Sequence, residues 1–230
     1  MTGRAFHDAD FSQAYVDGLP PKAVLLLAPP PWIEAGHGLS LHAEDARAAT
    51  SVCEALPSGR VLFHLTEEWL LGFLEPRARE IDARPAWLFA LDAKDFADGQ
   101  RHEVRPLTTS SAPLVAKAWE PDEDETLYVR SRIEAGPSAA VYVDGGPVAW
   151  GMTHFETEAI SEMGFLHVLE PYRRKGYARS VASALVKDVL RRGKIPILHV
   201  YANNTASLEL TASLGFHKVK RQVWGEAVLR

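Results

Sequence analysis

Residues 160–201 read ISEMGFLHVLEPYRRKGYARSVASALVKDVLRRGKIPILHVY, and this stretch decides the fold. Its first part, Ile160–Leu169, is an apolar strand that runs into the basic loop Arg173-Arg174-Lys175-Gly176-Tyr177. From Ala178 to Leu190 the apolar residues recur at the spacing of one helix face. A second strand follows over Ile195–Tyr201. A strand–helix–strand unit of this length predicts a right-handed crossover and a parallel pair of strands.

The loop between the first strand and the helix is suited to an anion. Backbone N–H groups at a helix start have no partner within the helix, and the helix dipole attracts negative charge. Gly176 allows a phosphate to approach the backbone, and Arg173, Arg174 and Lys175 add positive charge. A basic, solvated turn would carry the same residues. A Walker pattern and a glycine-rich dinucleotide fingerprint are absent, which argues against nucleoside triphosphates and NAD.

Further elements are predicted on both sides of this unit. The turn Asp144-Gly145-Gly146 joins two apolar runs and is a strong hairpin signal. The elements expected before the unit are a short strand at Val104–Leu107, helices at Ser111–Trp119 and Glu123–Ala135, and strands at Ser138–Val143 and Pro147–Phe155. Those expected after it are a helix capped by Asn203-Asn204-Thr205 and running through Leu214, and a final hairpin over Phe216–Val219 and Val223–Leu229.

The front of the chain alternates strands and helices but shows no catalytic spacing. The elements expected there are strands at Ala23–Ala28, Arg60–Leu65 and Ala86–Leu91, and helices at His42–Leu56 and Thr66–Leu74. The polar stretch Ala97–His102 stands between two apolar regions. It predicts two domains, residues 1–101 of α/β type and residues 102–230.

Composition narrows the class of protein. Of the 230 residues, 47% are hydrophobic and 24% are charged, as in soluble globular chains. The net charge of −5 argues against a nucleic-acid binder, which needs a basic face. The apolar run Ala23–Ala28 is far too short to span a membrane. Cys53 is the only cysteine, so no intrachain disulfide can form, and a reducing cytoplasm is the expected location.

The order of motifs from Val104 to the end resembles a known family. The motifs are a strand, Arg173-x-x-Gly176-x-Ala178, an amphipathic helix, a strand, Asn204-x-x-Ser207 and Leu214-Gly215-Phe216. Together they resemble the acyl-CoA-dependent N-acyltransferases of the GNAT superfamily. The ending is similar to the glycine N-acyltransferase-like branch, which often carries a degenerate companion half.

The resemblance implies an α/β (α+β) fold with a mixed, mostly antiparallel sheet. A splayed parallel strand pair and flanking helices belong to that sheet. A smaller α/β domain would precede it, and a degenerate GNAT-like half is one interpretation of that domain.

The resemblance also implies acetyl-CoA or another acyl-CoA as co-substrate. In this family the loop amides hold the pyrophosphate, and the pantetheine arm lies along the preceding strand like an added strand. An amide near His167 or Val168 would then polarise the thioester carbonyl. The cofactor-binding residues implied are Leu166, His167, Val168, Arg173, Arg174, Lys175, Gly176, Tyr177, Ala178, Asn204 and Ser207. For Asn204, simple helix capping is the alternative.

A base must deprotonate the acceptor, because an ammonium group has no lone pair with which to attack. Glu162 matches the family position for that base, and apolar neighbours on the face it shares with Gly164, Leu166 and Val168 would raise its pKa. An exposed strand-end glutamate is the alternative interpretation, and His167 is a second candidate. Where many members place an acidic tyrosine, this chain has Thr211, a poor general acid. Tyr201 or Tyr177 could substitute for it.

The predicted function is transfer of an acyl group, acetyl being favoured, to a primary amine of a small molecule or peptide by direct attack in a ternary complex. A catalytically silent acyl-CoA-binding sensor or interaction module is the alternative. Nucleic-acid and membrane partners are not expected, and a homodimer is left open. No metal is expected, because none of the nine histidines stands at ligand spacing.

Overall fold

The computed structural model describes residues 13–28, 36–119 and 124–230, which form two compact units. The first unit comprises the described residues up to Leu88, together with Tyr201–Asn203 and Lys220–Arg230. The second unit comprises the described residues of Phe89–Val200 and Asn204–Val219. The chain therefore passes between the units more than once. Whether residues 1–101 and 102–230 fold as separate domains stays a prediction.

The first unit is a sheet with helices packed on one face. Its strands lie in the order β1-β2-β3-β4-β10-β5. The bounds are β1 Gln13–Val16, β2 Ala23–Ala28, β3 His37–Ala43, β4 Gly59–Leu65, β5 Ala78–Ala90, α2 Ala46–Cys53 and α3 Leu71–Leu74, with short 3-10 turns at Glu68–Leu70, Glu75–Arg77 and Ala93–Asp95. Alternate residues of β2, such as Leu25, pack with Leu41, Phe63 and Val52 in a fully buried core. The strand residues that face the helices supply this core, as in a sheet with one covered face.

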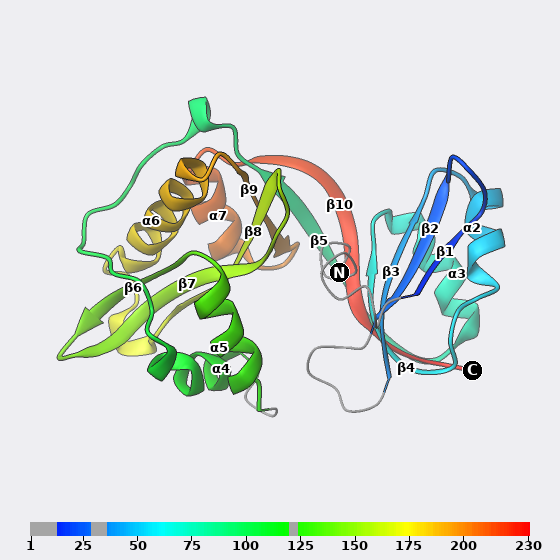
Figure 1. Cartoon of the computed structure of the whole chain (residues 1–230), viewed down its shortest axis with the longest axis horizontal. Helices are drawn as coiled ribbons and strands as arrows, with labels where there is room; N and C mark the ends of the chain where they lie inside the picture. Colours follow the sequence, from blue (N-terminus) through cyan, green and yellow to red (C-terminus); the bar gives the residue numbers. More distant parts are fainter. Residues whose placement is uncertain (1–12, 29–35, 120–123) are drawn as a thin grey trace. The chain divides into compact units, whose positions relative to one another are not determined.

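The second unit is a mixed sheet in the order β9-β8-β7-β6, with helices on both faces (Figure 1). β6, β7 and β8 are antiparallel, and β8 and β9 are parallel, as the fold prediction required. The bounds are α4 Ala112–Trp119, α5 Thr126–Ala135, β6 Ser138–Val143, β7 Gly146–Glu156, β8 Ile160–Val168, α6 Tyr177–Arg191, β9 Ile195–Tyr201 and α7 Thr205–Ser213, with 3-10 turns at Thr109–Ser111 and Glu170–Tyr172. Trp150 and Met152 pack toward α4 and α5, whereas an added Cβ on Gly151 would contact Val181 of α6.

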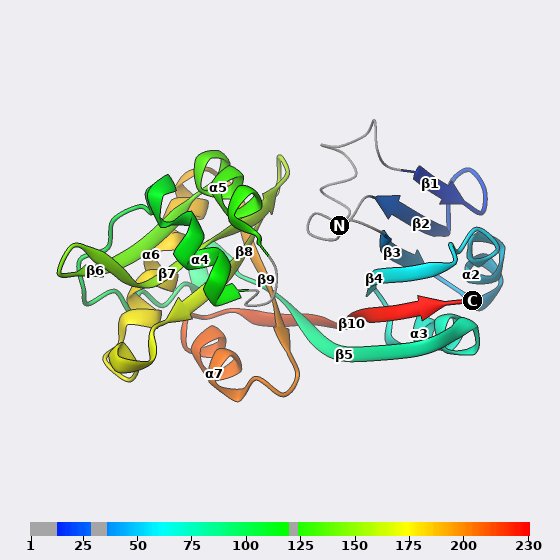
Figure 2. The same ribbon diagram turned by 90° about the horizontal axis from the view of Figure 1, so that it is seen from below.

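Several expected elements differ in the structure. The final hairpin is wrong: residues His217–Leu229 form one continuous strand, β10, which pairs with β4 along Gly59–Leu65 (Figure 2). The polar residues that were interpreted as a turn extend instead, since they contain no glycine or proline to reverse the chain. No strand forms at Val104–Leu107, where one isolated bridge joins Arg105 to Ala140.

Two predicted helices begin later than expected. His42 and Ala43 belong to β3, and the helix begins at Ala46 after Asp45, whose carboxylate accepts from Ala48 N. The segment after Thr66 is a 3-10 turn followed by the short helix α3. Glu123, the expected start of α5, lies outside the described residues. Among the described residues, no helix is long and apolar enough to cross a membrane.

Candidate active site

The parallel strands β8 and β9 separate at Glu162. They pair only from Ile160 with Ile195 to Glu162 with Ile197, although β8 continues to Val168 and β9 to Tyr201. Beyond Glu162, the described strands leave the β8 edge that faces β9 without a strand partner. An extended chain could add to that edge through main-chain hydrogen bonds.

A bulge at Phe165 changes the course of β8 within this open section. Phe165 has φ +53°, a left-handed conformation that strains a non-glycine residue by about 1–3 kcal/mol. The register shifts here, since His167 pairs with Trp150 and Gly164 pairs with Met152. Cross-strand partners share a face, so His167 lies on the face of Gly164. The predicted sharing of one face by Gly164, Leu166 and Val168 would put His167 on the other face. That alternation is wrong, because the bulge adds one residue to the strand.

Glu162 is a buried residue held by a histidine that the sequence patterns did not single out. Its side chain is 9% exposed, and its Oε1 lies 2.7 Å from Nδ1 of His199 on β9. Burial raises the pKa of Glu162, but the hydrogen bond and positive charge of His199 outweigh it and hold the pKa below its usual range. The expected raised pKa is wrong, because the apolar neighbours are accompanied by a charged partner. The expected alternative of an exposed glutamate is also wrong.

An aromatic cluster forms around Phe165 of β8, and one of its members, His154, interacts electrostatically with Glu162. His154 stacks on Phe165 at a ring distance of 4.1 Å, and Trp119 lies 4.5 Å from the same ring. An added Cβ on Gly164 would lie 2.3 Å from the His154 ring, so only glycine leaves the imidazole its place. Burial lowers the pKa of His154 to about 4, against the raising effect of the Glu162 charge. His154 is therefore neutral at pH 7.

The basic loop has the conformation of an anion cradle. Arg174 and Gly176 both have left-handed φ, +64° and +82°, and the first hydrogen bond of α6 runs from Ser180 N to Gly176 O at 3.1 Å. The amides before Ser180 therefore have no partner within α6, and a loop with alternating left-handed residues turns such amides to one side. An added Cβ on Gly176 would have only His102 Nε2 within 4 Å, at 3.6 Å. A diphosphate fits these groups in charge and in donor type.

The corresponding crossover of the first unit lacks both features. β3 and β4 are also parallel and joined by a helix, but they pair along their length, from His37 with Val61 to Leu41 with Leu65. At the start of α2 the Asp45 carboxylate accepts from Ala48 N at 2.9 Å. An acidic side chain in that position repels a phosphate and satisfies an amide that would bind it. Of the two crossovers, only the second presents an anion cradle beside an open strand edge.

Further predicted site residues lie on α7 and along the open part of β8. Asn204 is the N-cap of α7, and its Oδ1 accepts from Ser207 N at 3.1 Å. Helix capping by Asn204, the alternative in the sequence analysis, is therefore confirmed. Thr211 is 4% exposed within α7. Leu166 is 40% exposed on the open part of β8, and Arg173 Nε donates to Val168 O at 3.1 Å.

His167 stacks on Trp150, and burial, assisted by the charge of Arg173, lowers the pKa of His167. A lowered pKa makes it a weaker base than an exposed histidine. Trp150 is only 1% exposed and belongs to the core. Among the described residues, no three His, Cys, Asp or Glu side chains come together as a metal site would need.

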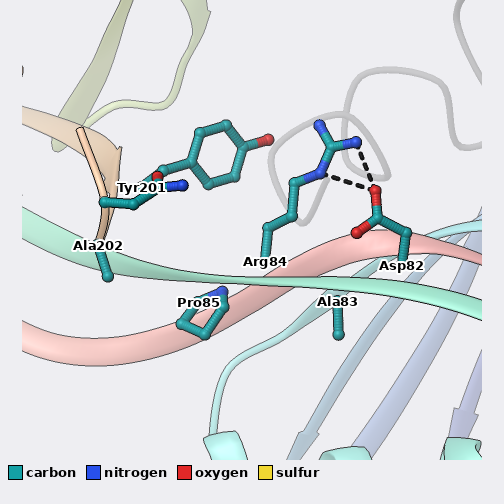
Figure 3. A pocket seen from close by; sticks show the side chains of 7 residues that line it. Asp82, Ala83, Arg84, Pro85, Tyr201 and Ala202 are labelled. Atoms are coloured by element: carbon teal, nitrogen blue, oxygen red, sulfur yellow. Dashed lines mark hydrogen bonds and ion pairs between the residues drawn. The ribbon is translucent and has the colours of Figure 1, made fainter.

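The two tyrosines considered as acids have separate neighbours. The Tyr177 ring stands edge-on to His102 at 4.6 Å. Tyr201 lies in an open pocket of about 710 Å³ in the first unit, with its hydroxyl directed toward Arg84 (Figure 3). Arg84 also donates from Nε to Asp82 at 2.9 Å. The pocket is lined by Asp82, Ala83, Arg84, Pro85, Tyr201, Ala202 and Asn203.

Comparison with known proteins shows which family model and which solved structures this chain is similar to. Residues 148–225 match the model of the FR47-like protein family. A Drosophila protein of known structure is 19% identical with a TM-score of 0.73, covering 90% of this chain and 74% of its own. A GCN5-related N-acetyltransferase from Kribbella flavida is 14% identical with a TM-score of 0.65, covering 99% of this chain and 93% of its own.

A tandem GNAT protein from the clavulanic acid biosynthesis pathway is also similar. It is 14% identical with a TM-score of 0.57, covering 90% of this chain and 79% of its own. These likenesses show that the chain has a GNAT-type fold, which confirms the predicted fold class.

Proposed function

We propose that this chain, whose fold is of the GNAT type, transfers an acyl group from acyl-CoA to a primary amine. One observation carries the proposal: β8 and β9 separate at the buried Glu162, which is paired with His199, and the open edge of β8 leads to the loop with left-handed Arg174 and Gly176. A long ligand with an anionic end and a reactive middle suits this arrangement. Acyl-CoA is such a ligand, and acetyl-CoA is the form we favour.

Each part of the ligand has a counterpart in the second unit. The main-chain amides of the loop, with Arg174 and Lys175, would hold the diphosphate. The open edge of β8 at Leu166, His167 and Val168 would pair with the pantetheine amides. Asn204 and Ser207 would contact the same arm from the start of α7. When bound, acyl-CoA supplies an activated thioester.

The acceptor amine attacks the thioester carbon directly. The C–N bond forms as the C–S bond breaks, and the sulfur leaves as a thiolate. The proton lost by the amine passes to the Glu162–His199 pair. Because the two side chains share a hydrogen bond of 2.7 Å, they take up that proton as one unit and not as two independent bases. Within the pair, His199 holds the pKa of Glu162 low, so the carboxylate retains the proton weakly and the imidazole must share it.

A general acid for the thiolate is not required. A thiol has a pKa near ~8.5, so the thiolate leaves readily and water can protonate it later. Thr211 is buried in α7 and is a poor acid, and we assign it no proton transfer.

The finer assignments belong to the proposal as well. We place the chain nearest the glycine N-acyltransferase-like branch, on the motifs Asn204-x-x-Ser207 and Leu214-Gly215-Phe216. The acceptor would be a small molecule or peptide amine. The single cysteine, Cys53, is a buried thiol, in keeping with a cytoplasmic enzyme.

Thiol release from acetyl-CoA tests this function. The full-length protein is mixed with acetyl-CoA and a panel of amino acids, polyamines, arylalkylamines and peptides, and free CoA thiol is measured against an amine-free control. We expect amine-dependent release with at least one acceptor class. Tight CoA binding in calorimetry without turnover on any amine would instead favour the silent binding module. Absence of CoA binding would overturn the proposal.

A further inference from the structure

Residues 98–102 form a strap that is hydrogen-bonded along α6. Gly99 N donates to Ser183 Oγ at 3.0 Å, and Arg101 N and His102 N donate to Ser180 Oγ at 3.0 and 3.3 Å. Both serines are fully buried. Asp98 adds an ion pair of 3.0 Å with Lys187. This polar stretch, expected to be a linker, therefore has a fixed position on the helix that follows the basic loop.

The strap delivers the His102 side chain to the basic loop. His102 Nε2 lies 2.9 Å from the carbonyl oxygen of Lys175. A carbonyl only accepts, so Nε2 carries the hydrogen and donates it. The imidazole also stands edge-on to the Tyr177 ring at 80°. His102 thus contacts the residues on both sides of Gly176.

This hydrogen bond controls the direction of a main-chain amide. The carbonyl of Lys175 and the N–H of Gly176 belong to one planar peptide unit and point in opposite directions. A carbonyl held toward His102 therefore turns the Gly176 N–H away from His102. Glycine has the widest conformational freedom of any residue, and at φ +82° this peptide would rotate readily without such a restraint.

We infer that His102 is a positioning residue of the acyl-CoA site, which sets the Gly176 amide for the diphosphate before the ligand binds. The inference rests on the proposed function, because it concerns the same loop. If the Gly176 N–H already has its direction before the ligand binds, binding does not have to order it. The loss of one hydrogen bond to a charged group weakens binding by about tenfold. The strap thereby becomes part of the cofactor site.

Three substitutions separate the two contacts of His102. His102→Gln keeps a terminal N–H donor but no ring, His102→Phe keeps the ring against Tyr177 but no donor, and His102→Ala keeps neither. Lys187→Ala is the matched control, because it removes the ion pair at the other end of the strap. Calorimetry measures binding of CoA and of pantetheine, which lacks the diphosphate.

We expect His102→Ala and His102→Phe to bind CoA about tenfold more weakly, while pantetheine binding stays unchanged. His102→Gln and Lys187→Ala should bind both ligands as the wild type does. Equal CoA affinity of wild type and His102→Phe would overturn the inference. So would an equal loss for CoA and pantetheine, which would indicate a general role in folding. If the wild type itself binds no CoA, the proposed function fails first.

Discussion

Glu162 Oε1 and His199 Nδ1 lie 2.7 Å apart, across two strands whose pairing ends at Glu162. The two residues are 37 positions apart in the chain, and a complete crossover helix separates them. Their contact closes the end of the opening between β8 and β9. A carboxylate and an imidazole at that point form a proton acceptor whose strength depends on both members, which makes the pair testable by single and double substitution.

Removal of either member of the pair should slow acyl transfer. Glu162→Gln keeps the shape but cannot take up a proton, and His199→Asn keeps a donor at the Nδ1 position without an imidazole. At pH 7 we expect kcat to fall by about 10²–10⁴-fold in each. The double variant should be little slower than the worse single variant, because residues that act as a unit are not additive.

The pH dependence distinguishes lost basicity from lost positioning. At pH 9.5 more of the amine is already neutral, so the deficit of Glu162→Gln should shrink if the pair acts as a base. Steady-state rates at pH 7 and pH 9.5 with saturating acetyl-CoA measure it. Full activity of Glu162→Gln at pH 7 would remove the pair from the reaction. An equal deficit at both pH values would assign it to orientation of the acceptor.

A side chain at Gly176 should abolish CoA binding without unfolding the protein. Gly176→Val places a β-branched residue at φ +82°, where the backbone must change to relieve strain. Gly145→Val is the matched control, since Gly145 has φ +83° in the β6–β7 turn with open space around it. Both variants should lose about 1–2 kcal/mol of stability in urea unfolding. Only Gly176→Val should lose CoA binding in calorimetry, and unchanged affinity would refute the cradle.

Substitution of Asn204 separates helix capping from contact with the pantetheine arm. Asn204→Ala removes the cap on Ser207 N and should cost about 1 kcal/mol of unfolding free energy. Asn204→Ser keeps an oxygen that can cap, so its stability should match the wild type. It lacks the amide donor, and we expect its KM for acetyl-CoA to rise about fivefold. A serine variant with wild-type stability and wild-type KM would leave Asn204 with capping alone.

His154 should make the protein less stable as the pH falls below 6.5. The folded state holds the pKa of His154 at about 4, below its ordinary value of 6.5, so the unfolded chain takes up a proton first. Stability therefore falls from pH 6.5 to about 4, by on the order of 2 kcal/mol. His154→Phe keeps an aromatic ring against Phe165 and should show a flatter profile. Urea unfolding of both proteins at pH 7, 5.5 and 4.5 measures how the free energy of unfolding changes with pH. Parallel profiles for the wild type and His154→Phe would contradict the prediction.

The local patterns of the sequence determined the elements around the basic loop. The period of apolar residues in 178–190 predicted α6, and the turn at Asp144-Gly145-Gly146 predicted the β6–β7 hairpin. Gly176 has φ +82°, a backbone conformation that favours glycine, and its close approach to a ligand stays a prediction. These features depend on residues that are close in the chain, so a single pass along the sequence contains the information.

The tertiary structure alone decided which distant groups meet. Nothing in the spacing of Glu162 indicates that His199 of the next strand donates to it, and that contact reverses the direction of the pKa shift. The bulge at Phe165 moved His167 to another face, because one extra residue inverts the alternation of every later side chain. His102 reaches the Lys175 carbonyl only because buried serines of α6 hold the strap. Long-range pairing energies select these contacts, and no local pattern encodes them.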